Sequence, residues 1–562
     1  MGEPQGERRR RAIGELLELL RRDGPLTKAD IHGAKIRLAR RHSLDRIPSD
    51  ADVLGQAGAD ERERLAPMLR TKAVRELSGV VTVAAMTSPE RCPHGKCLYC
   101  PGGAERGSPQ SYTGKEPAAM RGSNYGYDSY REVKGRLEQL RICGHHTDKV
   151  DLIVMGGTFP ARSLEYQARF ILGCYDALNG GPLLREHAAG RHMGENADGT
   201  ISANASGGPE ALERELKEAV DRNESAPARC IGLTIETRPD WCREEHIDRM
   251  LSFGTTRVEL GVQSLSDEAL KKMMRGHGIR ETMRATQLAR DAGLKVGYHM
   301  MPGFPFVERD EERSHYLRLF EDPGLKPDML KLYPTLVMEG TQLHEIWKRG
   351  GYKPLSTEEA TDMLAEQKSR FPPWVRVMRI QRDIPAQLIG DGVTKSNLRQ
   401  LVKKRMAEKG LVCRCIRCRE VGHLGIGARG DGDLGLERCG YEAAGGHEEF
   451  ISLETAEGAL AGYLRLRRPS PEAHRPELSD GKIAIVRELR VLGELVPLET
   501  RPEGRWQHRG LGARLLSEAE RISGEEWGLK RLLINSGAGA RGYYRKTGYG
   551  MVGPYMCKVL RS

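Results

Sequence analysis

Between about residues 80 and 340, six short apolar runs alternate with stretches of helical periodicity. The runs are GVVTVAAMT, VDLIVMGG, IGLTIETRPD, TRVELGVQS, LKVGYHMMPG and DMLKLYPTLV. Strands separated by helical patterns of about 10–15 residues predict βα units and a parallel sheet. Six such strands are enough for a partial or full barrel, in which functional side chains gather at the carboxyl ends of the strands. The pattern therefore predicts an α/β fold.

The chain of 562 residues is longer than one ordinary domain, and its composition changes along its length. We expect a helical, basic region over 1–80 and the barrel over 81–345. A linker with a basic helix and a second cysteine cluster follows over 346–445, and a second strand-and-helix domain over 446–562. The polar, glycine-rich start of 180–228 predicts an insertion within the barrel.

Charge and cysteine content limit the class of protein. The net charge of +11 indicates either a polyanionic partner or simply a solvated, arginine-rich surface. Twelve cysteines are too few for a disulfide scaffold, and their short clusters are typical of metal sites in a reducing compartment. The sequence contains no apolar run long enough to cross a membrane and no secretory signal, so we expect a cytoplasmic protein without a membrane partner.

The segment RCPHGKCLYC places Cys92, Cys97 and Cys100 directly after the first expected strand. Three thiolates with one open position fit either a catalytic zinc or an iron–sulfur cluster. A 4Fe-4S cluster held by three cysteines leaves one iron free to bind S-adenosylmethionine. In this respect the sequence resembles the radical S-adenosylmethionine superfamily. It has one residue more between the first two cysteines than the spacing common in that superfamily.

That resemblance implies further S-adenosylmethionine contacts at the ends of later strands. Gly156, Gly157 and Thr158 end the second strand, and a glycine lets a backbone approach a ligand closely. Glu236 and Gln263 end later strands and suit a polar pocket. Each of these motifs alone also fits an ordinary turn at a strand end.

The last domain contains a glycine motif between a strand and a helix. VRELRVLG reads as a strand, and QHRGLGARLLSEAERI opens a helix with Q-x-x-G-x-G. Free N–H groups at such a helix start can bind a pyrophosphate. A Rossmann site is excluded because the third glycine and the later acidic residue are missing. With KRLLINSG and ARGYYRKTGYG following, the order resembles the GNAT acetyltransferase fold, in which this turn holds acetyl-CoA and Tyr543 or Tyr544 would lie near the thioester.

A radical barrel followed by an acetyltransferase domain resembles the Elongator catalytic-subunit family. CPHGKCLYCPGG, DKVDLIVMGGTF, ELGVQS, RCRCIRCREVG, VRELRVLG and GYYRKTGYGMVGPYMCK are similar to segments of that family. The resemblance implies a tRNA-modifying enzyme that uses a 5′-deoxyadenosyl radical and acetyl-CoA to install a carboxymethyl group at C5 of the wobble uridine. A protein lysine acetyltransferase and a non-catalytic tRNA-binding scaffold are the alternatives.

The family resemblance also assigns roles to individual residues. Lys149 and Tyr544 would be catalytic and would contact acetyl-CoA. The other acetyl-CoA contacts would be Glu488, Leu489, Arg490, Val491, Gln507, Gly510, Leu511, Gly512 and Ala513.

The resemblance implies a structural zinc at Cys413, Cys415 and Cys418, with His423, Cys439 and His447 all open as fourth ligand. A second iron–sulfur cluster or free thiols remain alternatives for that trio.

The anticodon loop of tRNA is single-stranded, so its base can be splayed into a pocket. A basic surface is then expected, although a solvated helix face explains the first group of residues equally well. The candidates for phosphate contacts are Lys35, Arg37, Arg40, Arg41, Lys395, Arg399, Lys403, Lys404 and Arg405. The resemblance leaves open whether the chain self-associates or works without other Elongator subunits.

Overall fold

The computed structural model describes residues 4–22, 27–70, 76–181, 208–428, 434–498, 500 and 504–560. Of the expected insertion at 180–228, the part from 182 to 207 lies outside these residues. The described part of this segment contains helix α8 (Pro209–Arg222), at the place where a helix was expected. No described helix combines the length and the apolar character that crossing a lipid bilayer requires.

A seven-stranded, fully parallel sheet forms the barrel, in the order β1-β2-β3-β4-β5-β6-β8. The strands are β1 (Val81–Met86), β2 (Lys149–Met155), β3 (Arg229–Thr237), β4 (Arg257–Gln263), β5 (Lys295–Met300), β6 (Met329–Leu332) and β8 (Arg376–Arg379). All six expected strands are present. The seventh strand lies beyond residue 345, so the sheet extends into the segment expected to be linker. Because β1 and β8 are both edge strands, the barrel is partial.

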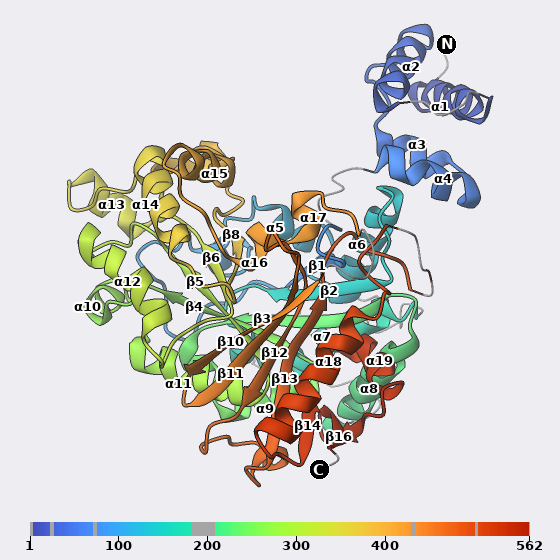
Figure 1. Cartoon of the computed structure of the whole chain (residues 1–562). Coiled ribbons are helices and arrows are strands. Elements are labelled where there is room, and N and C mark those ends of the chain that lie inside the picture. The colour runs from blue at the N-terminus through green and yellow to red at the C-terminus, as the bar shows by residue number, and fades with distance from the viewer. Residues whose placement is uncertain are drawn as a thin grey trace.

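Helices cover the outer face of this sheet, as its buried, apolar strands require (Figure 1). The helices between its strands are α5 (Pro117–Asn124), α6 (Ser129–Ile142), α7 (Leu164–Leu178), α8, α9 (Glu244–Ser252), α10 (Asp267–Lys272), α11 (Ile279–Asp291), α12 (Arg309–Glu321), α13 (Gln342–Lys348) and α14 (Thr357–Ser369). A small sheet pairs β7 (Val337–Met338) with β9 (Ile389–Asp391). Then follow α15 (Leu398–Glu408), α16 (Ile416–Arg419) and α17 (Val421–Leu424).

The second sheet has the order β10-β11-β12-β13-β14-β16-β15, and only its β13–β14 pair is parallel. Its strands are β10 (Gly435–Ala443), β11 (Gly446–Glu454), β12 (Leu460–Arg468), β13 (Ile483–Val491), β14 (Arg531–Ile534), β15 (Gly550–Val552) and β16 (Tyr555–Val559). Helices α18 (Leu511–Arg521) and α19 (Arg541–Arg545) complete this part of the chain. The sheet starts at Gly435, ahead of the expected boundary at 446.

The second sheet packs against the amino ends of the barrel strands. Asn535 donates to the carbonyls of Thr255 and Gly293, just before β4 and β5. A Cβ on Gly537 would lie 2.4 Å from the backbone of Ile231, so only glycine fits this contact. The loops at the carboxyl ends of the barrel strands are therefore at the far end of the barrel from this interface.

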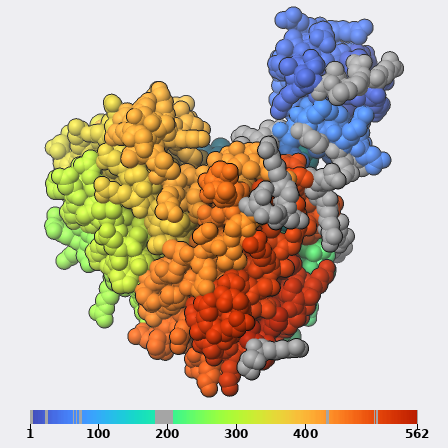
Figure 2. All heavy atoms as spheres, in the orientation of Figure 1, coloured from blue at the N-terminus to red at the C-terminus, as the bar shows by residue number. Residues whose placement is uncertain are grey.

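The first four helices form a lobe that projects from the rest of the molecule (Figures 1 and 2). They are α1 (Gln5–Arg22), α2 (Lys28–Arg41), α3 (Asp50–Gln56) and α4 (Ala59–Leu69), and they share a core of their own. The lobe touches the barrel near Gly144, where a Cβ would meet Leu54 and Ala66. This arrangement agrees with the expected helical region.

Candidate active site

The loop after β1 carries the first three cysteines at the carboxyl end of the barrel. Cys97 and Cys100 are buried and Cys92 is partly buried. The glycine pair that ends β2 lies beside them, since Thr158 Oγ1 is 3.8 Å from Cys92 Sγ. Gly156 has φ +120°, and a Cβ there would come within 2.2 Å of Thr87 Oγ1. The glycine at this position therefore allows β2 to end against the cysteine loop.

The surroundings of the thiols suit an anionic group. Arg275 Nη1 lies 3.5 Å from Cys97 Sγ, and Gln110 Nε2 lies 3.3 Å from Cys100 Sγ. Burial raises the pKa of the Cys92 and Cys100 thiols, so an ion that binds sulfur is needed to hold them as thiolates. Buried donors that lack protein partners, Arg275 Nε and Arg238 Nη1, lie in the same region. This donor set fits an iron–sulfur cluster carried by three thiolates.

A cavity of about 820 Å³ runs from this loop through the interior of the barrel. At one end it is lined by all three cysteines, Gly157 and Thr158, and at the other by Ser78, Val80 and Arg490 of β13. Of the five residues expected to contact S-adenosylmethionine, four line the cavity, and Gly156 adjoins them. Glu236 and Gln263 lie at the carboxyl ends of β3 and β4, where they were expected.

The cavity also contains a charged cluster that the sequence motifs did not fully reveal. Glu259 is ion-paired with Lys331 and accepts a hydrogen bond from His299 Nε2 at 2.9 Å. Lys331 also pairs with Glu236 at 3.1 Å, and Tyr112 of the cysteine loop donates to Glu236. His299 and Lys331 were not expected here. A charged or polar residue inside an otherwise apolar strand, as in GYHMMPG and MLKLYP, was the available signal.

Lys149 lies at the opposite end of the barrel from the cysteines. It begins β2, so about 20 Å of strand separates it from the glycine pair. Its Nζ contacts Val496 O at 2.7 Å, Gln507 Oε1 at 3.1 Å and His508 Nε2 at 3.0 Å. Burial lowers its pKa to about 8. The residue therefore faces the second domain and does not reach the cysteine loop.

The expected acetyl-CoA residues 488–491 lie where the pairing between β13 and β14 ends. Pairing between these strands ends at Val486, opposite Ile534, which leaves residues 487–491 without a β14 partner among the described residues. Helix α18 starts beside them, and its N-cap Gly510 has φ +82°. Backbone groups of the strand and of the helix start are thus brought close together.

Like Lys149, several of the expected acetyl-CoA side chains are buried or bonded within the protein. Glu488 is buried and bonded to Arg465 at 3.0 Å, and Gln507 bonds Lys149 and the backbone N–H of Val496. Tyr544 is buried among core residues, whereas Tyr543 is exposed and its hydroxyl lies 3.0 Å from where a Cβ of Gly512 would be. Tyr543, and not Tyr544, is therefore exposed beside Gly512 in the first turn of α18.

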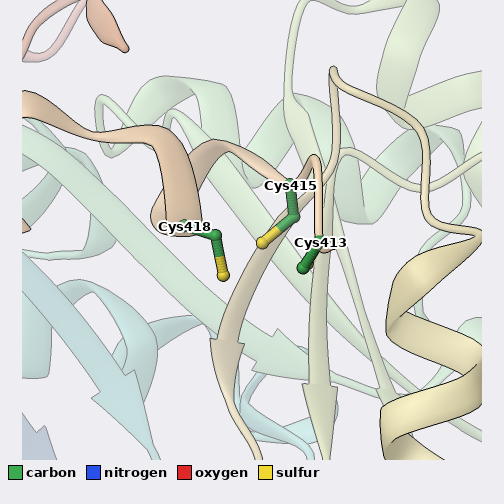
Figure 3. A group of neighbouring side chains, drawn as sticks. All are labelled: Cys413, Cys415 and Cys418. Carbon is green, nitrogen blue, oxygen red and sulfur yellow. The ribbon is translucent and has the colours of Figure 1, made fainter. Parts of the chain in front are cut away.

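The three residues of the second cysteine trio are neighbours in the structure (Figure 3). The sulfurs of Cys413, Cys415 and Cys418 all lie within 4.8 Å of one another, a limit that includes the separation of about 3.8 Å expected around a tetrahedral zinc. None of His423, Cys439 and His447 belongs to this group among the described residues. Instead Lys368 Nζ lies 3.1 Å from Cys413 Sγ and 3.7 Å from Cys418 Sγ.

The expected phosphate contacts differ in their exposure. Arg37, Arg40, Arg41, Lys395, Lys403 and Lys404 are exposed. Lys35 is 3% exposed and ion-paired with Asp50, so its expected phosphate contact is wrong for this structure. Arg399 donates to the carbonyls of Val377 and Met378, and Arg405 pairs with Asp362. The Arg399 and Arg405 side chains therefore stabilise the linker through contacts within the protein.

The families that match this chain cover successive parts of it, in the same order as the structural units. Three family models match: the ELP3 N-terminal domain over residues 10–77, the radical SAM superfamily over 86–319 and the Radical_SAM C-terminal domain over 327–408. The last of these includes β8, in agreement with the seven-stranded sheet.

Curated relatives match over nearly the whole chain. A tRNA uridine(34) acetyltransferase of Methanocaldococcus jannaschii is 47% identical over 559 residues, 98% of this chain and 97% of the relative. Elongator complex protein 3 of Drosophila melanogaster is 42% identical over 573 residues, 100% of this chain and 98% of the relative. Among solved structures, the archaeal Methanocaldococcus infernus Elp3 lacking its N-terminus is 45% identical with a TM-score of 0.71, covering 86% of this chain and 100% of that one.

Proposed function

Because the chain belongs to the family of the tRNA uridine(34) acetyltransferases and Elongator complex protein 3, we propose that it adds a carboxymethyl group to C5 of the wobble uridine of tRNA. Its substrates are the anticodon loop, acetyl-CoA and S-adenosylmethionine. C5 of uracil has no leaving group, so a radical route avoids a difficult two-electron acyl transfer.

The observation that carries the proposal is the continuous cavity. It joins the cysteine loop at one end of the barrel to Arg490 of the second domain at the other. A group held at the second domain and a radical formed at the cysteines can therefore meet inside the barrel.

At the cysteine end, Cys92, Cys97 and Cys100 would hold a 4Fe-4S cluster, with Gly157, Thr158, Glu236 and Gln263 around S-adenosylmethionine. When bound, these groups supply a 5′-deoxyadenosyl radical that removes a hydrogen atom from the acetyl methyl group of acetyl-CoA. The chain's own residues orient the reactants: the glycine turn keeps side chains away from the cofactor, and Arg275 and Arg238 balance the negative charge. The methyl carbon would bond to C5, and the adduct would then lose the C5 hydrogen as a proton and return one electron to the oxidised cluster. Hydrolysis of the thioester leaves the carboxymethyl group.

In the second domain, the unpaired ends of β13 and β14 and the start of α18 support a GNAT-type acetyl-CoA site. The backbone of 489–491 can pair with the amides of the pantetheine arm, and the first turn of α18 (Leu511–Ala513) can bind the pyrophosphate. Lys149 and Gln507 fix the loop that precedes α18.

Between the two domains, Cys413, Cys415 and Cys418 would bind a structural zinc. The exposed arginines of α2 and the lysines of α15 would contact tRNA phosphates. Cys415→Ser tests the zinc assignment: we expect loss of zinc with the iron content unchanged. Equal zinc in the variant and the wild type contradicts it.

The test of the function is anaerobic reconstitution with iron and sulfide, followed by nucleoside mass spectrometry after incubation with tRNA, acetyl-CoA and S-adenosylmethionine. We expect 5-carboxymethyluridine in the wild type and none in Cys97→Ala, which should still bind tRNA. Modification by Cys97→Ala, or acetylation of peptides without any cleavage of S-adenosylmethionine, overturns the proposal.

A further inference from the structure

His299 and Glu259 form a hydrogen-bonded pair that lines the barrel cavity. Glu259 is 1% exposed, and its Oε2 accepts from His299 Nε2 at 2.9 Å. The His299 ring lines the cavity and is held edge-on by Tyr333, at 5.6 Å between centroids. The imidazole is thus oriented by one buried carboxylate and one aromatic ring.

The charge state of Glu259 decides which nitrogen of His299 carries the proton. Burial alone would raise the pKa of Glu259, but Lys331, His299 and Arg257 outweigh it and hold this pKa well below its usual range. An ionised carboxylate only accepts hydrogen bonds, so Nε2 must be the donor. The neutral ring then has its lone pair on Nδ1, which forms no hydrogen bond with any residue that the structure describes. This is the arrangement by which a carboxylate prepares a histidine to act as a base.

The other acids that line the cavity already have partners. Glu236, Glu259 and His299 offer ligand atoms within 4.8 Å of one another, as a metal ion would need. However, the Lys331 ammonium contacts both carboxylates and supplies the positive charge there, so the cluster is complete without a metal. Elsewhere in the cavity, Asp151 pairs with Arg257, Asp383 pairs with Arg379, and Glu116 accepts from Thr113.

We propose that His299 is the general base for the hydrolysis of the thioester once the acetyl carbon has bonded to uridine C5, and that Glu259 positions it. This inference rests on the proposed function. His299 Nδ1 takes a proton from water, the water oxygen bonds to the thioester carbonyl carbon, and the carbon–sulfur bond breaks. The proton on Nδ1 then passes to the departing CoA thiolate, while the new acid loses its own proton to solvent. No oxidant or reductant is consumed.

The test uses the reconstituted full-length enzyme with tRNA, acetyl-CoA and S-adenosylmethionine. For His299→Gln we expect 5′-deoxyadenosine to form within about threefold of the wild-type rate, while release of carboxymethyluridine falls about 10²–10⁴-fold, as loss of a general base implies. tRNA that carries CoA as a thioester should accumulate, visible by mass spectrometry of nuclease fragments. His315→Gln on α12, outside the cavity, is the matched control and should retain full product formation.

A second variant separates base catalysis from packing. Added imidazole should restore product in His299→Ala, because that variant lacks only the base. It should not restore product in Cys97→Ala, which lacks a ligand of the cluster. Unchanged product in His299→Gln, or loss of product with an equal loss of 5′-deoxyadenosine and no thioester adduct, overturns the assignment. Absence of carboxymethyluridine in the wild type contradicts the proposed function instead, so the two failures are distinguishable.

Discussion

Arg487 and Asp328 form a two-point ion pair across the contact between the two sheets. Arg487 Nη1 lies 2.7 Å from Asp328 Oδ2, and Nη2 lies 2.8 Å from Oδ1. Both side chains are fully buried, and Asp328 also pairs with Arg290 and Arg465. One carboxylate at the amino end of β6 therefore binds arginines from β13, β12 and α11. This network sets the position of the second domain at the base of the cavity.

Asp328→Asn should destabilise the fold strongly. It leaves three buried guanidinium groups with one carboxylate fewer, and breaking a buried ion pair typically costs about 3–5 kcal/mol. Chemical denaturation measured against the wild type checks this. Asp310→Asn, which removes a solvent-exposed ion pair with Arg313, is the control and should change stability little. Equal midpoints for both variants would show that the network does not hold the interface.

Lys149→Gln should impair the steps that depend on acetyl-CoA and leave cleavage of S-adenosylmethionine intact. The ammonium bonds the loop before α18, and losing hydrogen bonds to a charged group costs about 1.5–3 kcal/mol, or roughly 10–100-fold in affinity. Acetyl-CoA affinity and 5′-deoxyadenosine formation without acetyl-CoA are the two measurements. An equal loss in both would place the lysine's effect at the cysteine end, contrary to its position in β2.

Glu132 should make stability fall as the pH rises. Burial raises the pKa of its carboxyl from 4.5 to about 7, with the backbone N–H of Met86 as its hydrogen-bond donor. The folded state thus binds more protons than the unfolded state between these values, so stability is lost as the pH rises through this window. The free energy of unfolding of Glu132→Gln should therefore rise by about 2.5 kcal/mol relative to that of the wild type between pH 5 and pH 8. Urea denaturation at pH 5 and pH 8 measures this. An equal difference in unfolding free energy between variant and wild type at the two pH values would disprove the prediction.

Replacing Arg37, Arg40 and Arg41 together by Gln should weaken tRNA binding at low salt. For every phosphate that these side chains neutralise in the wild type, the slope of log K against log salt should become shallower by about 0.7–0.9 in the variant. Titrations at several salt concentrations measure this, and Arg313→Gln on α12 serves as a control at another exposed arginine. Unchanged affinity and slope would assign the α2 arginines to the solvated surface alone.

The elements and motifs that depend on near neighbours in the chain could be predicted from the amino-acid sequence. Alternating apolar runs specify the parallel strands because each run must be buried under helices, and the cysteine and glycine spacings fix local turns. Two cofactor motifs in one chain could thus be recognised from short segments such as CPHGKCLYCPGG and QHRGLG.

Which distant residues meet became known from the folded chain alone. Glu259, His299 and Lys331 come from three strands and become neighbours because parallel pairing aligns their registers. Likewise, Lys149 and the glycine pair that lies beside the cysteines are at opposite ends of β2. From the sequence, the buried arginines of β12 and β13 would be expected at the surface. In the folded chain they are buried because Asp328 and Glu448 lie beside them. Such contacts depend on packing across the whole chain, which no local pattern encodes.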